Sequence, residues 1–172
     1  MLNRGSVQHL NANSSPEEVA AVDIIDRHFA AENAHDIEGT LATYTDDIVW
    51  DDVTHPLCPV QGKEAAGSIY AGIIDAIPDV HLESVRRFNS GDVVVDESVL
   101  TGHVHGEWAG VDGGGAPVRV RVLHVFDIRD GLIARENTWF DASAVMRQVE
   151  EFKARPEPAG QPAETSRSQS PR

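Results

Sequence analysis

A histidine interrupts the apolar face of a predicted strand in residues 118–128. The even positions of this segment are apolar apart from His124, whereas Arg119 and Arg121 occupy odd positions. Because successive side chains of a strand point to opposite faces, we expect His124 to point inward among apolar groups. Burial of a polar ring costs free energy unless the ring finds a partner. His124 is therefore either a core histidine with a hydrogen-bond partner or a working group in a cavity.

A carboxylate stands in a similar position near the end of another predicted strand, residues 47–53. Asp52 shares a face with Ile48 and Trp50, and apolar surroundings would raise its pKa toward the range of a general base. Proton abstraction next to a ketone needs a base and also a donor for the enolate oxygen. Asp52 and His124 supply this pair if both face one cavity. The alternative is that Asp52 binds loop amides ahead of His55.

Three further histidines could take part. His28 lies beside the apolar stripe of the first predicted helix and could be a second donor, or else a partly exposed helix histidine. His103 and His105 share a strand face, and two histidines at this spacing can bind a metal ion when a third ligand is near. No third ligand stands at a fixed spacing, so we expect rim or solvent-facing histidines and no metal.

The last predicted strand, residues 132–140, carries Glu136 and Thr138 on one face. Glu136 could act as an acid or base, and the simpler interpretation is an exposed cross-strand partner of an arginine. The residues that we expect to contact a substrate are Trp50, Phe29, Val122, Phe126, Glu136 and Thr138.

The elements that must position these side chains fall into two groups. A capping box at residues 15–18 predicts the start of a first helix, and Pro78 ends a third. Further helices are predicted at 36–44, 63–76 and 143–153, and a long antiparallel meander at 80–88, 92–105, 118–128 and 132–140. The pattern predicts an α+β fold, in which a cone-like curved antiparallel sheet wraps around three N-terminal helices and a short C-terminal helix closes the domain.

Length, charge and cysteine content limit the domain organisation and the classes of binding partner. The 172 residues predict one domain at 15–153, with disordered segments at 1–14 and at the Pro/Ser-rich residues 154–172. The net charge of −14 opposes binding to nucleic acid or to an anionic membrane. A single cysteine excludes an intrachain disulfide. With no apolar run long enough to cross a membrane and no signal-like start, the expected location is the cytoplasm.

Several segments together resemble the SnoaL-like polyketide cyclases of the nuclear transport factor 2-like superfamily. They are residues 44–52, 62–65, 77–80 and 124–133, followed by 135–141, in that order along the chain. The resemblance covers about residues 17–150 and implies a cone-shaped apolar pocket.

The resemblance also implies roles for individual positions. Asp52 matches the carboxylate base of the ketosteroid isomerase branch, in which a pocket acid aligns with His124 and a tyrosine donor with His28. SnoaL-like cyclases also carry a histidine at His124, but their catalytic aspartate falls on Thr138 here. A catalytic histidine of the scytalone dehydratase branch aligns with His103.

The first hypothesis is therefore a small enzyme without metal or organic cofactor. Asp52 would remove a proton from a hydrophobic polyketide-like or steroid-like carbonyl compound, and His124 would stabilise the oxyanion during isomerisation or cyclisation. The alternatives are a dehydratase that uses His103 or His124, and a non-catalytic ligand-binding module. Arg119, Arg121, Leu123 and Val125 on the outer sheet face are a candidate homodimer surface.

Overall fold

The computed structural model describes residues 16–155. The predicted disorder of the ends, and Ser15 of the capping box, fall outside this range except for residues 154 and 155. The helices within it are α1 (Pro16–Asn33), α2 (Ile37–Ala42), α3 (Lys63–Ala76) and α4 (Ala142–Lys153). The strands are β1 (Tyr44–Asp52), β2 (Val60–Gln61), β3 (His81–Ser90), β4 (Val93–Val104), β5 (Glu107–Trp108), β6 (Val111–Asp112), β7 (Ala116–Arg129) and β8 (Leu132–Phe140).

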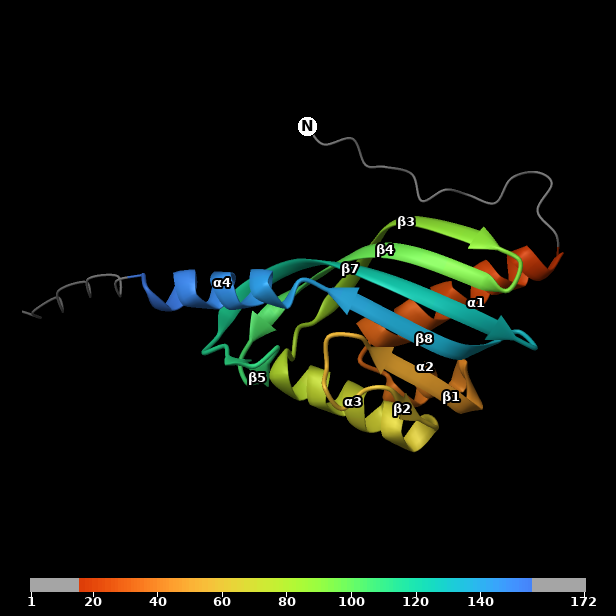
Figure 1. The fold of residues 1–172 in the computed structure, drawn as a ribbon, viewed down its shortest axis with the longest axis horizontal. Helices are drawn as coiled ribbons and strands as arrows, with labels where there is room; N and C mark the ends of the chain where they lie inside the picture. Colours follow the sequence, from red (N-terminus) through yellow and green to blue (C-terminus); the bar gives the residue numbers. More distant parts are fainter. Residues whose placement is uncertain (1–15, 156–172) are drawn as a thin grey trace, which may run out of the picture.

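One curved sheet organises the domain, with strand order β2-β1-β8-β7-β4-β3 (Figure 1). Strands β3, β4, β7 and β8 form the predicted antiparallel meander, and β1 joins its edge parallel to β8. The α+β cone is thus confirmed, but the sheet is mixed because its first strand runs parallel to its last. Parallel pairing requires a long crossover, and the whole of the chain between β1 and β8 supplies it.

The helices cover the concave face of this sheet. α1 packs against β3, β4 and β8, α3 packs against β1, and α4 packs against β7 at the other end of the sheet (Figure 1). Local signals define the helix ends: Asp141 caps α4 by accepting a hydrogen bond from Ala144 N at 3.0 Å. α3 begins after Gly62, whose φ of +87° is a conformation that favours glycine. The predicted helix 36–44 is shorter than expected, because Tyr44 already belongs to β1.

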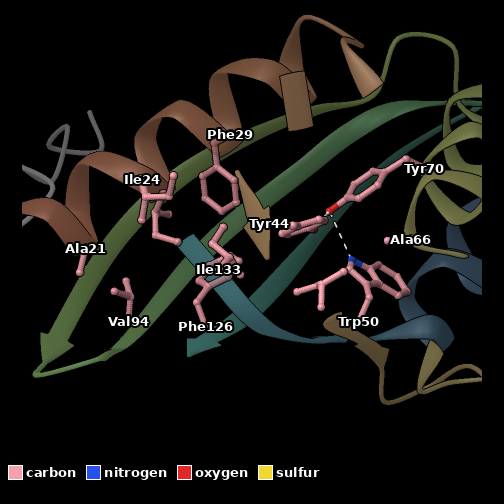
Figure 2. Packing of buried hydrophobic residues seen from close by; sticks show 12 residues of the cluster. Ala21, Ile24, Phe29, Tyr44, Trp50, Ala66, Tyr70, Val94, Phe126 and Ile133 are labelled. Atoms are coloured by element: carbon pink, nitrogen blue, oxygen red, sulfur yellow. Dashed lines mark hydrogen bonds between the residues drawn. The ribbon is translucent and has the colours of Figure 1, made fainter. Parts of the chain in front are cut away.

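Two apolar clusters fill the space between helices and sheet. The first joins α1, β1, α3 and the β7–β8 end of the sheet, and Figure 2 shows its Phe29, Tyr44, Trp50 and Tyr70. The second lies under α4, around Val120, Val122 and Val145. No helix in the described range is both long and apolar enough to cross a membrane.

Candidate active site

Three polar side chains form a row across the middle of the sheet. Asp52 on β1 pairs in register with Thr138 on β8, and Thr138 pairs with His124 on β7. Side chains that are opposite each other in a sheet share a face. The inward face predicted for Asp52 and for His124 is therefore the same face, and Thr138 stands between them.

A cavity of about 320 Å³ lies over this row. Asp52, His124 and Thr138 all line it, as do Glu136 and the ring of Trp50. Its apolar lining includes Ile69, Ile73, Leu82, Leu100, Val122 and Phe140. A mostly apolar hollow with a few convergent polar groups is typical of small-molecule sites.

Asp52 is half-buried at the point where β1 ends. Thr54 donates to its Oδ1 twice, from the backbone N at 2.8 Å and from Oγ1 at 2.6 Å. The loop-binding interpretation is thus correct for one oxygen. The other oxygen, Oδ2, accepts no hydrogen bond from the described residues, so it is available to a group in the cavity.

His124 is buried, with a polar neighbour near each ring nitrogen. Ser98 Oγ lies 3.2 Å from Nδ1, and Glu136 Oε1 lies 4.0 Å from Nε2. The ring stacks on Phe126 at 5.6 Å between centroids and meets Phe29 edge-on at 5.3 Å. A carboxylate near Nε2 favours a proton on that nitrogen, so the ring can donate into the cavity from Nε2.

The row continues beyond His124 as a buried ion pair. Asp96 on β4 is opposite His124, and Arg87 on β3 is opposite Asp96. Both are buried, and Arg87 Nε donates to Asp96 Oδ2 at 2.8 Å while its guanidinium lies over Phe29. Arg87 also pairs with Asp26, and Asp96 does not line the cavity, so the carboxylate of the row that faces the cavity is that of Asp52.

Glu136, which our simpler interpretation placed at the surface, is only 1% exposed. Its Oε2 accepts a hydrogen bond from the hydroxyl of Tyr44 and lies 3.4 Å from that of Tyr70. The two tyrosine oxygens are 2.6 Å apart, and Trp50 Nε1 donates to Tyr70 at 3.3 Å. Figure 2 shows Tyr44 and Tyr70 pointing toward one another, with the indole nitrogen of Trp50 directed at Tyr70. These donors fix Glu136 so that its Oε1 is turned to His124.

His28 completes this buried cluster and is fully buried, contrary to the expectation of a partly exposed helix residue. Thr43 Oγ1 donates its only proton to Thr40 O at 2.6 Å, so at 2.8 Å it accepts from His28 Nδ1. The other nitrogen, Nε2, lies 3.3 Å from both Glu32 Oε1 and Glu136 Oε2.

Burial alone would lower the pKa of His28, but the carboxylates of Glu32 and Glu136 outweigh it and raise the pKa to about 10. Burial works against the charge of Glu136 as well, and the charge of His28 prevails to hold the pKa of Glu136 below its usual range. Atoms of His28, Glu32 and Glu136 lie within 4.8 Å of one another and could hold a metal ion. Because the pKa of His28 is about 10, its Nε2 carries a proton at neutral pH. This proton already occupies the space between the two carboxylates that a metal ion would take.

Some predicted site residues lie away from the cavity. Phe29 and Phe126 pack behind the ring of His124 rather than lining the hollow. His28 supports Glu136 from the side of α1. His103 is exposed at the far end of β4 and pairs with Asp79 Oδ2 at 2.6 Å, because its odd position faces away from the concave side. Trp50, Val122, Glu136 and Thr138 do line the cavity.

Glu32, Tyr44 and Tyr70 are parts of the site that sequence reasoning missed. Tyr44 sits at a boundary where helix and strand patterns overlap, and Tyr70 lies on an ordinary amphipathic helix. The one available signal for Glu32 is its spacing of four from His28, which places both on one helix face.

The outer face of the sheet follows the predicted alternation. Leu123 of β7 is 39% exposed and Trp139 of β8 is 37% exposed. Arg121 lies beside Leu123 on the same strand and forms an ion pair with Glu97. Pairing of two copies through this face stays a prediction.

Known proteins share the fold of this chain. The SnoaL-like domain model matches residues 25–136, more than half of the chain. No curated protein shows a significant sequence match. A candidate SnoaL-like polyketide cyclase from Jannaschia sp. CCS1 is 25% identical with a TM-score of 0.74, over 85% of this chain and 100% of that chain.

Two more solved structures share the fold at lower identity. IdmH, a candidate polyketide cyclase from Streptomyces antibioticus, is 22% identical with a TM-score of 0.64, over 76% of this chain and 98% of that one. An LEH-like epoxide hydrolase from M. tuberculosis is 18% identical with a TM-score of 0.64, over 79% of this chain and 93% of that one. The match to the SnoaL-like domain model, with the Jannaschia structure, supports a cyclase or isomerase type of function in general. The chain belongs to the SnoaL-like domain family, within the nuclear transport factor 2-like superfamily.

Proposed function

We propose that the chain is an enzyme that removes a proton from a hydrophobic carbonyl compound held in the cavity, and that isomerisation or intramolecular cyclisation follows. The observation that carries this proposal is the row of Asp52, Thr138 and His124 beneath one apolar cavity. Two strand spacings separate the backbones of Asp52 and His124 by about 10 Å. This span leaves room for a carbonyl group and its acidic C–H bond between the two side chains.

Asp52 acts as the base in this mechanism. Oδ2 takes the proton from the carbon next to the carbonyl, and the electron pair of the C–H bond becomes the C=C bond of an enolate. Thr54 keeps Oδ1 in place, so the carboxylate needs no reorganisation when the reaction starts.

His124 stabilises the negative charge that reaches the carbonyl oxygen, by donating from Nε2–H. Glu136 Oε1 favours the proton on that nitrogen, and Ser98 can donate to Nδ1. The enolate then either recovers the proton from Asp52 at another carbon, which is isomerisation, or attacks a second carbonyl of the same molecule, which is aldol-type cyclisation. In the second route the C=O π bond opens to an alkoxide, which takes the proton held by Asp52 and so restores the base. A base and a donor from the chain complete both routes without an organic cofactor.

Deuterium exchange tests the first step without knowledge of the product. The protein is incubated in D₂O with a panel of apolar cyclic ketones, and mass spectrometry follows deuterium at the carbon next to the carbonyl. We expect Asp52→Asn to slow exchange about 100-fold or more, as loss of a general base does. Asp51→Asn is the matched control, because Asp51 is its neighbour but pairs with Arg135 on the opposite face.

Equal exchange rates in the wild-type protein and Asp52→Asn would exclude Asp52 as the base. Ketones that bind to the wild-type protein and never exchange would overturn the enzymatic proposal and favour a ligand-binding module.

A further inference from the structure

Glu32 lies at the last turn of α1 and lines the same cavity. Its side chain is only 9% exposed, although it carries a carboxylate. Oε1 faces His28 Nε2 at 3.3 Å, whereas Oε2 is buried and has no hydrogen-bond partner among the described residues. A buried carboxylate oxygen without a donor is costly, so a donor from a bound molecule would stabilise it.

The charged side chains of the cavity lining are mostly negative, so the lining favours a ligand without negative charge. It includes the four carboxylates Glu32, Asp52, Glu107 and Glu136, and among its described residues there is neither a lysine nor an arginine. The cationic ring of His28 lies between Glu32 and Glu136 and is shared by both. A ligand that brought its own carboxylate or phosphate would meet uncompensated negative charge.

A second unpartnered oxygen of the lining, that of Thr138, shows where Glu32 lies relative to the proposed reacting groups. Thr138 Oγ1 is also buried without a partner in the described part of the chain, and it stands in the row of Asp52 and His124. Glu32 lies instead beside Glu136, one inward position further along β8, which corresponds to about 7 Å at strand rise. The cavity therefore presents an acceptor at a separate point from the proposed reacting groups.

We propose that Glu32 determines ligand specificity: the cavity binds an apolar molecule without negative charge that donates an O–H or N–H hydrogen bond to Glu32 Oε2. This assignment rests on the proposed function only in calling that molecule a substrate. The binding preference itself follows from the unpartnered oxygen, the cavity and the charge of its lining.

Isothermal titration calorimetry with matched naphthalene probes tests the preference. The probes are 2-naphthol, its methyl ether, 2-naphthylmethylamine and 2-naphthoate, which share one apolar body and differ in the polar group. We expect the wild-type protein to bind the naphthol or the amine about tenfold or more tightly than the ether, in line with a hydrogen bond to a charged acceptor, and the carboxylate most weakly. A preference for the naphthol alone identifies a hydroxyl as the donor, and one for the amine alone identifies an ammonium.

Glu32→Gln should abolish the preference of the wild-type protein for donor over ether. Glu107→Gln is the matched control, because it removes an equal charge from an exposed position of the same lining. Equal wild-type affinities for all donors and the ether would overturn the proposal even if Glu32→Gln failed to fold, and so would an unchanged preference in a folded Glu32→Gln variant. Asp52→Asn should keep the preference, so a failure of the catalytic proposal is distinguishable from a failure of this one.

Discussion

Raising the pH should destabilise this protein through a single buried histidine. The pKa of His28 is about 10 in the folded state against 6.5 for the free side chain, because the carboxylates of Glu32 and Glu136 outweigh the cost of burial. A raised pKa means that the folded state holds a proton which the unfolded chain releases. The resulting stability is complete below pH 6.5 and disappears as the pH rises toward 10.

The size of this effect follows from proton linkage. With these two pKa values, the free energy of unfolding should fall by about 3 kcal/mol between pH 7 and pH 9.5. The range stops at pH 9.5 because Tyr44 and Tyr70 begin to contribute above it. Burial, and then the nearby Glu136, raise the pKa of both tyrosines well above 10, so their unfolded forms ionise first.

Urea unfolding at pH 7, 8 and 9.5 measures the slope, and NMR titration of the His28 ring in the folded protein measures its pKa directly. His28→Gln should flatten the dependence, whereas replacement of the exposed His81 by Gln should leave it unchanged. A midpoint near 6.5 in the NMR titration, or a free energy of unfolding that is constant over this range, would refute the reasoning.

Three other substitutions test the packing and one buried hydrogen bond. In Gly113→Ala the new methyl group would meet Val104 O at 2.1 Å, so urea unfolding should show a loss of about 1–3 kcal/mol. Gly72→Ala on α3 meets no atom within 4 Å and should gain up to about 1 kcal/mol from helix propensity, and equal midpoints for the two variants would contradict this difference. Tyr70→Phe removes the acceptor of the Trp50 indole and should cost about 1–2 kcal/mol with a change in Trp50 emission, whereas an unchanged midpoint and spectrum would show that this hydrogen bond contributes nothing.

Sequence alternation predicted the faces of the site well. His124 was expected on the inner face of its strand, and Asp52 was expected beside Trp50, and both predictions are confirmed. Alternation is a local property of the strand, so it needs no knowledge of distant partners. It carries no information about strand direction, which is why the parallel pairing of β1 with β8 was not predicted.

The buried cluster could not be predicted for the opposite reason. A glutamate on a strand and a histidine on a helix are ordinary surface residues unless each neutralises the other. Glu136 and His28 neutralise each other although most of the sequence of the domain separates them, and Tyr44 contributes a hydrogen bond from a third segment. No local pattern marks such a contact, because burial of each group depends on the presence of the others.

The parallel pairing of β1 with β8 also determines when the site forms. Asp52 reaches the row only after the chain that follows it has folded into the meander, since β8 is the strand on which β1 docks. Contacts of such large sequence separation close late and slow the folding of a domain. The proposed proton abstraction would then be a stricter reporter of complete folding than helix content, because a chain with its helices and hairpins in place but β1 undocked would keep its helical signal in circular dichroism and lack the proposed base.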